Sequence, residues 1–312
     1  MKPHLAKQKT GRLSVRATEL CDPVPHELDV RDAIAYVRTC GWRQQPHPNP
    51  RVRAFESAPS PPADRERPAL LFPSGSHADV GSPDSSYASN PAIAERTLDA
   101  LRALAAAEGR SLAAAIADVR AAAPTTWVAL FGTSADPPTE GHKAILAWLS
   151  DRFDCVAVWA SDNPFKSHQT ALAHRMEMLR LTIADLNCPA ANMRLCKELS
   201  SSRSWVTVCA ARKIWGAGAH LTFVVGSDLV PQMPRWYAAR DLLQAVELAI
   251  VPRPGYPLQV EDLKRLSQLG AVWDIADLTA PAVSSTAYRE QRAADAIPLP
   301  VQKYIDRYQL YA

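Results

Sequence analysis

The fold is decided by the stretch Trp127-Val-Ala-Leu-Phe131, which continues as Gly132-Thr-Ser-Ala-Asp-Pro-Pro-Thr-Glu-Gly-His142 and then as Lys143-Ala-Ile-Leu-Ala-Trp-Leu149. The first part is a short apolar run typical of a buried strand, the second is a loop rich in Gly and Pro, and the third has the pattern of an amphipathic helix. A strand–loop–helix junction directs main-chain N–H groups and a helix N-terminus to one point, which favours phosphate binding. His142 stands where the helix begins.

Apolar and helical segments alternate along the rest of the chain. Strands are predicted at Trp127–Phe131, Cys155–Ala160, Met193–Cys196, Leu221–Val225, Glu247–Val251 and Ala271–Ile275. Helices are predicted around 141–150, 172–186, 205–215, 237–245, 260–269 and 284–292. This alternation predicts an α/β fold with a doubly wound parallel sheet, in which ligands bind at the carboxyl ends of the strands near the topological switch point. The loop 132–142 leaves the first strand at that edge.

Composition excludes several classes of protein. The chain has 312 residues, 47% of them hydrophobic, and a net charge of +3, which gives no case for a nucleic-acid partner. No apolar run reaches membrane-spanning length, and no signal-peptide core follows the basic N-terminus. The six cysteines are scattered without a CxxC pair, so a disulfide framework or a zinc site is not expected. A cytoplasmic enzyme without membrane contact is the simplest interpretation.

Residues 1–91 differ from the rest in composition. The part from 44 to 91 is dense in Pro, Ser, Arg and Asp and lacks periodic apolar residues, which predicts a mostly disordered extension. One short helix over Leu28–Val37 is possible, but the sequence offers little for it to pack against. A start codon placed too far upstream would make part of this segment non-native.

Residues 92–123 predict a short helical hairpin. Leu98, Leu101 and Leu104 recur at helical spacing, and Ser111 is placed to cap a second helix. Its role is not readable from the sequence, and a helical addition or an oligomerisation element is the default. The predicted organisation is therefore an extension over 1–91, the hairpin over 92–123 and a catalytic domain over 124–312.

Two motifs carry a resemblance to a known superfamily. Thr139-Glu-Gly-His142 resembles the (H/T)xGH element of the GxFxPxHxGH signature, and Val283-Ser-Ser-Thr-Ala-Tyr-Arg289 resembles the ISSTxxR signature. Both belong to the nucleotidylyltransferase superfamily, which implies a Rossmann-like nucleotidylyltransferase fold. Alone, the first motif could be an ordinary strand–helix loop with a surface histidine, but the joint match is far more specific.

Further segments narrow the resemblance. These are Asn163-Pro-Phe-Lys-Ser-His168, Arg175-Met-Glu-Met-Leu-Arg180, Gly226-Ser-Asp228, Arg235-Trp-Tyr237 and Val251-Pro-Arg-Pro-Gly-Tyr-Pro-Leu258. The series is similar to the bacterial nicotinate-nucleotide adenylyltransferases and covers roughly 126–312. It implies adenylyl transfer from ATP to nicotinate mononucleotide, giving deamido-NAD and pyrophosphate in NAD biosynthesis.

The resemblance also implies roles for individual residues. The catalytic set is His142, Thr139 and Arg289. The set that binds ATP or phosphate is Gly132, Thr133, Ser134, Lys166, His168, Gly226, Asp228, Ser285 and Thr286. The set that binds the mononucleotide is Asn163, Trp205, Trp236, Tyr237 and Arg253. Mg²⁺ is expected to be held mainly by phosphates, without a protein metal site.

Bland alternatives exist for most of these residues. Ser285 and Thr286 could cap a helix, Lys166 and Arg289 could be solvated charges, and Trp236 could be a core aromatic. What favours function is their shared position after strand ends.

The chain departs from the family pattern at a few positions. Thr133 replaces the second glycine, Ala135 replaces an aromatic residue, and Ser204-Trp-Val-Thr207 differs where the family contacts the nicotinate. These departures keep two alternatives open: adenylyl transfer to nicotinamide mononucleotide or phosphopantetheine, and a nucleotide-binding regulatory protein without turnover. The expected partners are ATP and a pyridine mononucleotide, with a homo-oligomer possible.

Overall fold

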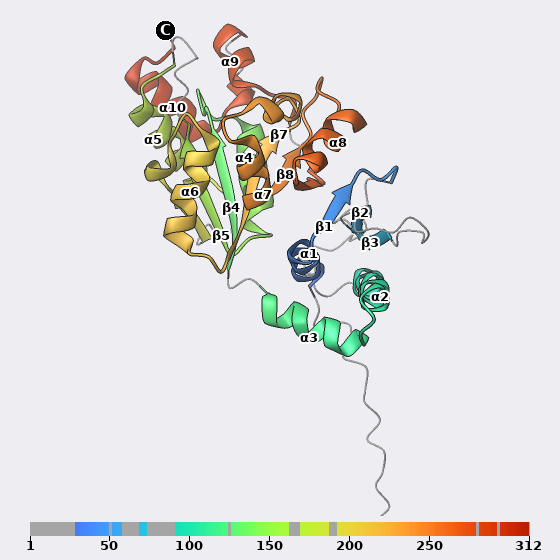
Figure 1. Ribbon diagram of the computed structural model, residues 1–312. Coiled ribbons are helices and arrows are strands. Elements are labelled where there is room, and N and C mark those ends of the chain that lie inside the picture. Colours follow the sequence, from blue (N-terminus) through green and yellow to red (C-terminus); the bar gives the residue numbers. More distant parts are fainter. Residues whose placement is uncertain are drawn as a thin grey trace, which may run out of the picture.

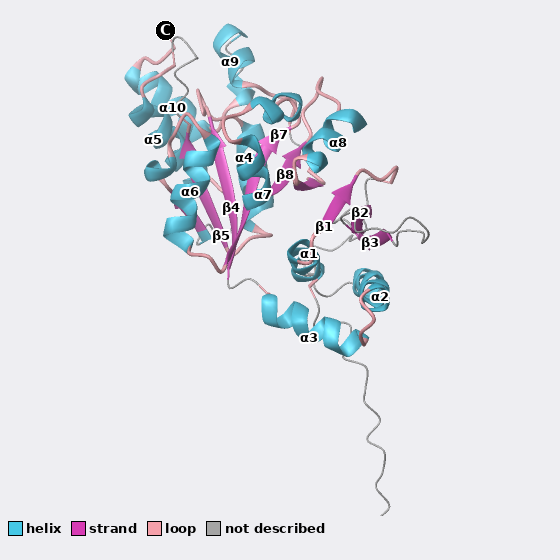
Figure 2. Ribbon diagram, in the orientation of Figure 1, coloured by secondary structure: helices cyan, strands magenta, loops and turns pink. Residues whose placement is uncertain are grey.

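The computed structural model describes residues 29–49, 52–57, 69–73, 91–123, 126–161, 169–186, 192–278, 281–291 and 294–311 (Figure 1). Within these ranges, six strands form one sheet and three strands form a second, smaller sheet. Figure 2 shows the strands of the large sheet at the centre of the larger body, with helices around them.

The large sheet is parallel throughout. Its strands are β4 (Thr126–Thr133), β5 (Cys155–Ala160), β6 (Met193–Leu195), β7 (Ala219–Gly226), β8 (Glu247–Val251) and β9 (Val272–Ile275). The six predicted strands are confirmed, with ends that differ by at most two residues. They were readable because strands covered on both faces form nearly continuous apolar runs, as in β5, where five of the six residues are buried and none is charged.

The helices of this part also follow the prediction within two residues. They are α4 (Glu140–Ser150), α5 (Leu172–Ala184), α6 (Ser204–Trp215), α7 (Ala239–Ala245), α8 (Val260–Gln268) and α9 (Ser285–Gln291). Short 3₁₀ turns stand at η4 (Lys197–Leu199), η5 (Val230–Arg235) and η6 (Ala294–Ala296). A further helix, α10 (Leu299–Tyr308), was not predicted as a helix, and it forms a small core with α5 through Met178, Val301 and Ile305.

The strand order places the site. The order is β6-β5-β4-β7-β8-β9, so the chain moves outward from β4 to β6 and then returns to the other side of β4 with β7. This is the doubly wound arrangement, and its switch point lies between β4 and β7. The loops that follow these two strands therefore border the crevice where a ligand is expected.

The N-terminal part contains more structure than its composition predicts. It has α1 (Val30–Thr39), β1 (Trp42–Gln45), β2 (Val52–Ser57), β3 (Ala69–Pro73), α2 (Pro91–Ala107) and α3 (Leu112–Ala122). The three strands form an antiparallel sheet. The predicted helical hairpin is present as α2 and α3, with the Ser111 hydroxyl accepting from the N–H of Ala114 at 3.2 Å.

The expectation that the helix near Leu28–Val37 has little to pack against is wrong. Ile34 and Val37 of α1 are buried in one cluster with Phe55, Phe72 and Leu101. Sequence windows miss this cluster because its strands are short and are separated by polar, Pro-rich segments, so no window shows a sustained period. The rest of the predicted disordered extension, at 1–28, 58–68 and 74–90, lies outside the described residues.

The small sheet is attached to the edge of the large one by side chains. The Gln44 amide accepts from the N–H of Trp273 at 2.9 Å and donates to its carbonyl at 2.8 Å. Trp273 lies on β9, the edge strand, so a buried side-chain amide takes the place of a further strand. This pairing satisfies an edge that would otherwise present open main-chain groups.

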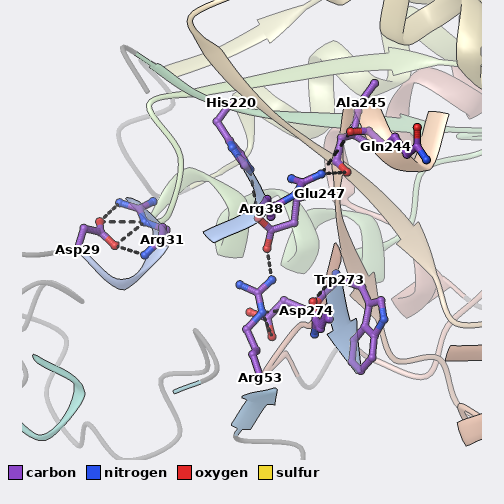
Figure 3. Close-up of polar contacts among 12 residues, drawn as sticks. Asp29, Arg31, Arg38, Arg53, His220, Gln244, Ala245, Glu247, Trp273 and Asp274 are labelled. Carbon is purple, nitrogen blue, oxygen red and sulfur yellow. Dashed lines mark hydrogen bonds and ion pairs between the residues drawn. The ribbon is translucent and has the colours of Figure 1, made fainter. Parts of the chain in front are cut away.

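Buried charges reinforce this attachment (Figure 3). The Arg53 guanidinium on β2 is paired with one carboxylate oxygen of Glu247 on β8, and His220 Nε2 lies 3.1 Å from the other. Burial alone would raise the pKa of Glu247, but Arg53, His220 and Arg38 outweigh it and hold that pKa far below its ordinary value. Glu247 is therefore ionised, and its charge is compensated across the interface.

None of the described helices combines the length and the apolar character that crossing a bilayer requires.

Replacing Arg53 by Met tests the buried ion pair. The variant leaves the Glu247 charge without its main partner, so we expect the free energy of unfolding to fall by about 3 kcal/mol in urea titrations. The double variant Arg53→Met, Glu247→Gln removes both charges and should recover a large part of the loss. Equal losses in the single and double variants would show that the pair contributes little.

Candidate active site

The loop after β4 holds His142 in a defined orientation. Thr139 precedes α4 as its N-cap, and its N–H donates to His142 Nδ1 at 3.0 Å. The Thr133 hydroxyl, at the end of β4, lies 2.8 Å from His142 Nε2. Because Nδ1 accepts from a main-chain N–H, the ring proton of the neutral imidazole is on Nε2, which donates to Thr133. Both ring nitrogens are thus fixed by residues of the same loop.

The environment of His142 favours the neutral imidazole. Burial, and secondly the positive charge of Arg253, lower the pKa of His142 to about 4. At neutral pH the side chain therefore offers one N–H donor without a charge of its own. An anion at this point would be stabilised first by that N–H group and by Arg253.

The second motif is bonded directly to this loop. The Ser285 hydroxyl donates to the carbonyl of Pro137 at 2.7 Å, and the Arg289 guanidinium donates to the carbonyl of Asp136. Arg289 also reaches the Thr286 hydroxyl at 3.3 Å. The two segments, far apart in the sequence, therefore form one structure around the start of α4.

Gly141 of the first motif is buried beside the segment that leads into the second motif. A Cβ atom at Gly141 would lie 3.5 Å from the Pro281 carbonyl oxygen and 3.7 Å from a Val283 methyl group, which is ordinary van der Waals contact. Tyr311, near the C-terminus, closes the same region by donating its hydroxyl to Asp136 Oδ1 at 2.6 Å.

The end of β7 supplies an acidic group beside a basic one. Asp228 Oδ2 pairs with the Arg253 guanidinium at 2.9 Å, whereas Asp228 Oδ1 is buried and has no hydrogen-bond partner among the described residues. A Cβ at Gly226 would collide with this carboxylate and lie 2.8 Å from Arg253 Cδ. Asp228 Oδ1 can therefore accept a hydrogen bond from a hydroxyl group of a ligand.

Arg175 is a structural member of the site that the sequence did not single out. Its guanidinium is fully buried and donates to the carbonyls of Thr170 at 2.7 Å, Ser134 at 3.0 Å and Ser161 at 2.7 Å. These carbonyls belong to the loops that follow β4 and β5. Arg175 therefore fixes the two loops relative to each other, and the only available signal was its place at the start of α5 in a family-like segment.

Gly132 has a requirement that its motif did not reveal. A Cβ there would lie 2.5 Å from two ring atoms of Trp159, the residue paired with it on β5. The glycine thus makes room for an indole ring inside the sheet. Whether its main chain also contacts phosphate stays a prediction.

The aromatic candidates have mixed positions. Trp205 and Trp236 are half-buried and pack against the main core, whereas the Tyr237 side chain is 56% exposed. The Arg203 guanidinium lies 4.4 Å from the centre of the Tyr237 ring. A core role is therefore evident for the two tryptophans, and contact with a substrate ring stays a prediction. Asn163, Lys166 and His168 lie outside the described residues.

The arrangement is suited to binding and stabilising phosphate. Hydroxyl groups, an imidazole N–H and two guanidinium groups gather at the carboxyl edge of β4 and β7. The described residues contain no group of three or more His, Cys, Asp or Glu that could hold a metal ion. These donors are of the kind that stabilise charge on phosphoryl groups during transfer.

Comparison with known proteins agrees with this geometry. A family described as cytidylyltransferase-like matches residues 130–291. A probable nicotinate-nucleotide adenylyltransferase of Synechocystis sp. is 44% identical over an alignment of 196 residues, and the match covers 59% of this chain and 98% of that protein. The nicotinate-nucleotide adenylyltransferase of Escherichia coli strain K12 is 28% identical over an alignment of 209 residues, and the match covers 59% of this chain and 97% of that protein.

A solved structure supports the same fold. Nicotinic acid mononucleotide adenylyltransferase of Plasmodium falciparum, complexed with NaAD, matches with a TM-score of 0.53 at 18% identity. The match covers 60% of this chain and 97% of that one. The predicted fold of the catalytic part is thereby confirmed.

The depressed pKa of His142 predicts a pH-dependent stability. The unfolded imidazole titrates near its ordinary pKa of about 6.5, whereas the folded one titrates at about 4. As the pH falls, His142 therefore binds a proton in the unfolded chain before it does so in the folded chain. The contribution of His142 to stability is constant above about pH 6.5, and it is lost as the pH falls toward 4. Between pH 7 and 4.5 we expect His142 to account for a loss of about 2 kcal/mol.

Urea titrations of the wild type and of His142→Gln over that pH range measure this contribution. The variant should show a shallower decline, and His174→Gln on α5 is the matched control. Identical declines in wild type and His142→Gln would contradict the assignment.

The three carbonyl contacts of Arg175 predict that its shape matters as much as its charge. Arg175→Lys keeps the charge but cannot reach all three acceptors, so we expect the free energy of unfolding to fall by about 2 kcal/mol. Arg180→Lys, which changes an exposed arginine paired with Glu177 on the same helix, should leave the free energy of unfolding nearly unchanged. Equal effects of the two substitutions would refute the proposed role.

Proposed function

The chain belongs to the cytidylyltransferase-like family, where its relatives are nicotinate-nucleotide adenylyltransferases, and we propose that it transfers the adenylyl group of ATP to nicotinate mononucleotide. The products are deamido-NAD and pyrophosphate, in NAD biosynthesis. One observation carries the proposal: the segments 132–142 and 283–289 are bonded together around His142 through Ser285 and Arg289. The 44% identity over nearly the whole length of a relative supports the choice of substrates.

The reaction needs no nucleophile from the protein. The phosphate of the mononucleotide is already anionic at pH 7 and attacks the α-phosphorus of ATP, forming a new P–O–P linkage as the bond to pyrophosphate breaks. The obstacle is to bring several anions together and to stabilise charge on the leaving group. The protein contributes positions and donors rather than a general base.

His142 contributes the donor closest to the helix start. Its Nε2–H leaves Thr133 and donates to the α-phosphate, while Thr139 keeps Nδ1 as an acceptor. The nearby negative charge raises the pKa of the imidazole, so the hydrogen bond strengthens as charge develops. Arg289 and the Thr286 hydroxyl lie on the same side and are suited to the β- and γ-phosphates.

Asp228 and Arg253 act on the other side of the switch point. The free Oδ1 atom of Asp228 accepts from a hydroxyl of the bound nucleotide, and the ion pair with Arg253 fixes its direction. Arg253 keeps positive charge near the reacting phosphates. Tyr237, which is exposed, would contact the pyridine ring of the acceptor in this proposal.

Mg²⁺ fits this site as a partner of ATP. The donors described are N–H groups, hydroxyls and guanidinium groups, which contact phosphate oxygens, so the ion would be held mainly by the phosphates themselves. When bound, it neutralises charge on the triphosphate. The proposed partners are ATP and the mononucleotide. A cytoplasmic location and a possible homo-oligomer are further parts of the proposal.

Pyrophosphate release in the presence of Mg²⁺ and ATP tests the function. We expect release that depends on nicotinate mononucleotide, with a higher kcat/KM than for nicotinamide mononucleotide or phosphopantetheine. His142→Ala should lower kcat by about 10²- to 10³-fold, because it removes one preorganised donor. His174→Gln is the control outside the site.

A folded full-length sample that releases no pyrophosphate above background would sink the proposal. Binding of ATP without turnover would then favour a regulatory nucleotide-binding protein. A higher kcat/KM for another acceptor would retain adenylyl transfer and change the substrate.

A further inference from the structure

A cavity lies at the amino ends of β7 and β9, whereas His142 follows the carboxyl end of β4. The volume of the cavity is about 830 Å³. The N-terminal part lines it with α1, the start of β1 and the end of α3, and the catalytic part lines it with the start of β7, the end of α7 and the start of β9. The cavity therefore lies between the two parts of the chain.

The cavity is separate from the site described above. Ala219 and His220, at the beginning of β7, line the cavity, whereas Gly226 and Asp228 stand at the end of this strand. Eight residues of strand span roughly 25 Å. A molecule in this cavity cannot contact groups reacting at His142.

Positive charge dominates the lining. Arg38 and Arg43 line the cavity together with His220, and no Asp or Glu does. Arg43 is exposed and has no hydrogen bond or ion pair among the described residues. The Arg38 guanidinium donates only to the carbonyls of Val246 at 3.2 Å and Gln244 at 3.4 Å, within the part of the chain that the structure describes.

The nearest carboxylate does not neutralise Arg38 by direct pairing. Arg53 and His220 take the two oxygens of Glu247, and Figure 3 shows Arg38 beside this group. Burial lowers the pKa of Arg38 more than the nearby Glu247 carboxylate raises it. A bound anion would supply the missing partner.

Small residues leave room for such an anion. Ten of the seventeen lining residues are Ala or Gly, among them Gly41, whose φ is 83° and whose missing Cβ would meet nothing within 4 Å. Trp42 borders the cavity, but its side chain is buried in the N-terminal cluster. The volume lies within the range of sites for small molecules, roughly 300–1,000 Å³.

We propose that this cavity binds a small phosphate-bearing molecule of mononucleotide size. Its phosphate is held by the guanidinium groups of Arg38 and Arg43, and the rest of the molecule occupies the space beside the alanine and glycine residues of the lining. A phosphate monoester carries nearly two negative charges at pH 7, which matches two guanidinium forks better than one carboxylate would. Because Arg38 and Arg43 belong to the N-terminal part and His220 to the sheet, the ligand joins the two parts.

Hydrogen–deuterium exchange of the full-length protein with adenosine monophosphate tests the site. Peptides that cover 38–43 and 216–220 should exchange more slowly when the nucleotide is added. Inorganic phosphate should protect them more weakly and adenosine should not protect them. Peptides that cover 132–142 and 226–228 report the catalytic site separately, so failure of adenylyl transfer leaves this measurement readable.

Two variants and a control sharpen the test. Arg43→Gln should weaken binding at least about tenfold without affecting folding, since Arg43 is exposed, and Arg38→Lys should also weaken it because the fork is lost. Arg240→Gln, which removes an exposed arginine on α7, should leave the affinity unchanged. Protection by adenosine alone, or none at 38–43 with millimolar nucleotide, would overturn the proposal, as would an Arg43→Gln affinity equal to that of the wild type.

Discussion

The hydrogen bonds that Arg289 and Ser285 make to the carbonyls of Asp136 and Pro137 are the constraint on which the site depends. They join a loop at the carboxyl end of β4 to a segment about 150 residues later in the chain. The sheet order makes this possible, because β4 is central and the chain returns beside it only after it has crossed the switch point. Next to these carbonyls, Thr139 stands at the start of α4 and its N–H group is hydrogen-bonded to His142 Nδ1.

The catalytic part was readable from the sequence because its local and long-range signals agree. Buried parallel strands are nearly continuous apolar runs, as β5 shows, so the local sequence marks them. His142 and Arg289 could be paired from their motifs before the structure brought them together. A sequence is predictable when its local patterns and its long-range motifs indicate the same fold. The residue roles inferred from the resemblance, including those of Lys166 and His168, still depend on that resemblance.

The features that the sequence did not reveal depend on contacts between residues that are distant in the chain. In the sequence, Arg175 has the pattern of a solvent-exposed charged residue. Its three carbonyl acceptors come together only when the loops after β4 and β5 meet in the folded chain. Gly132 has the pattern of a phosphate loop, yet its neighbour is Trp159 from the next strand. The small sheet was missed for the same reason, since Phe55 and Leu70 become core residues only against α1 and α2.

The N-terminal part has a physical role whether or not it binds a ligand. Glu247 begins β8 inside the sheet, and an ionised carboxylate there requires compensation that His220 alone supplies poorly, because burial lowers the pKa of the imidazole and favours its neutral form. Arg53 supplies a permanent charge from the small sheet, and Gln44 covers the main chain of Trp273 at the same edge. A catalytic domain without this part would expose the edge strand β9 and leave the Glu247 carboxylate without the positive charge of Arg53. The residues of β8 and β9 are therefore matched to their N-terminal partner through the Arg53–Glu247 ion pair and the two hydrogen bonds between Gln44 and Trp273.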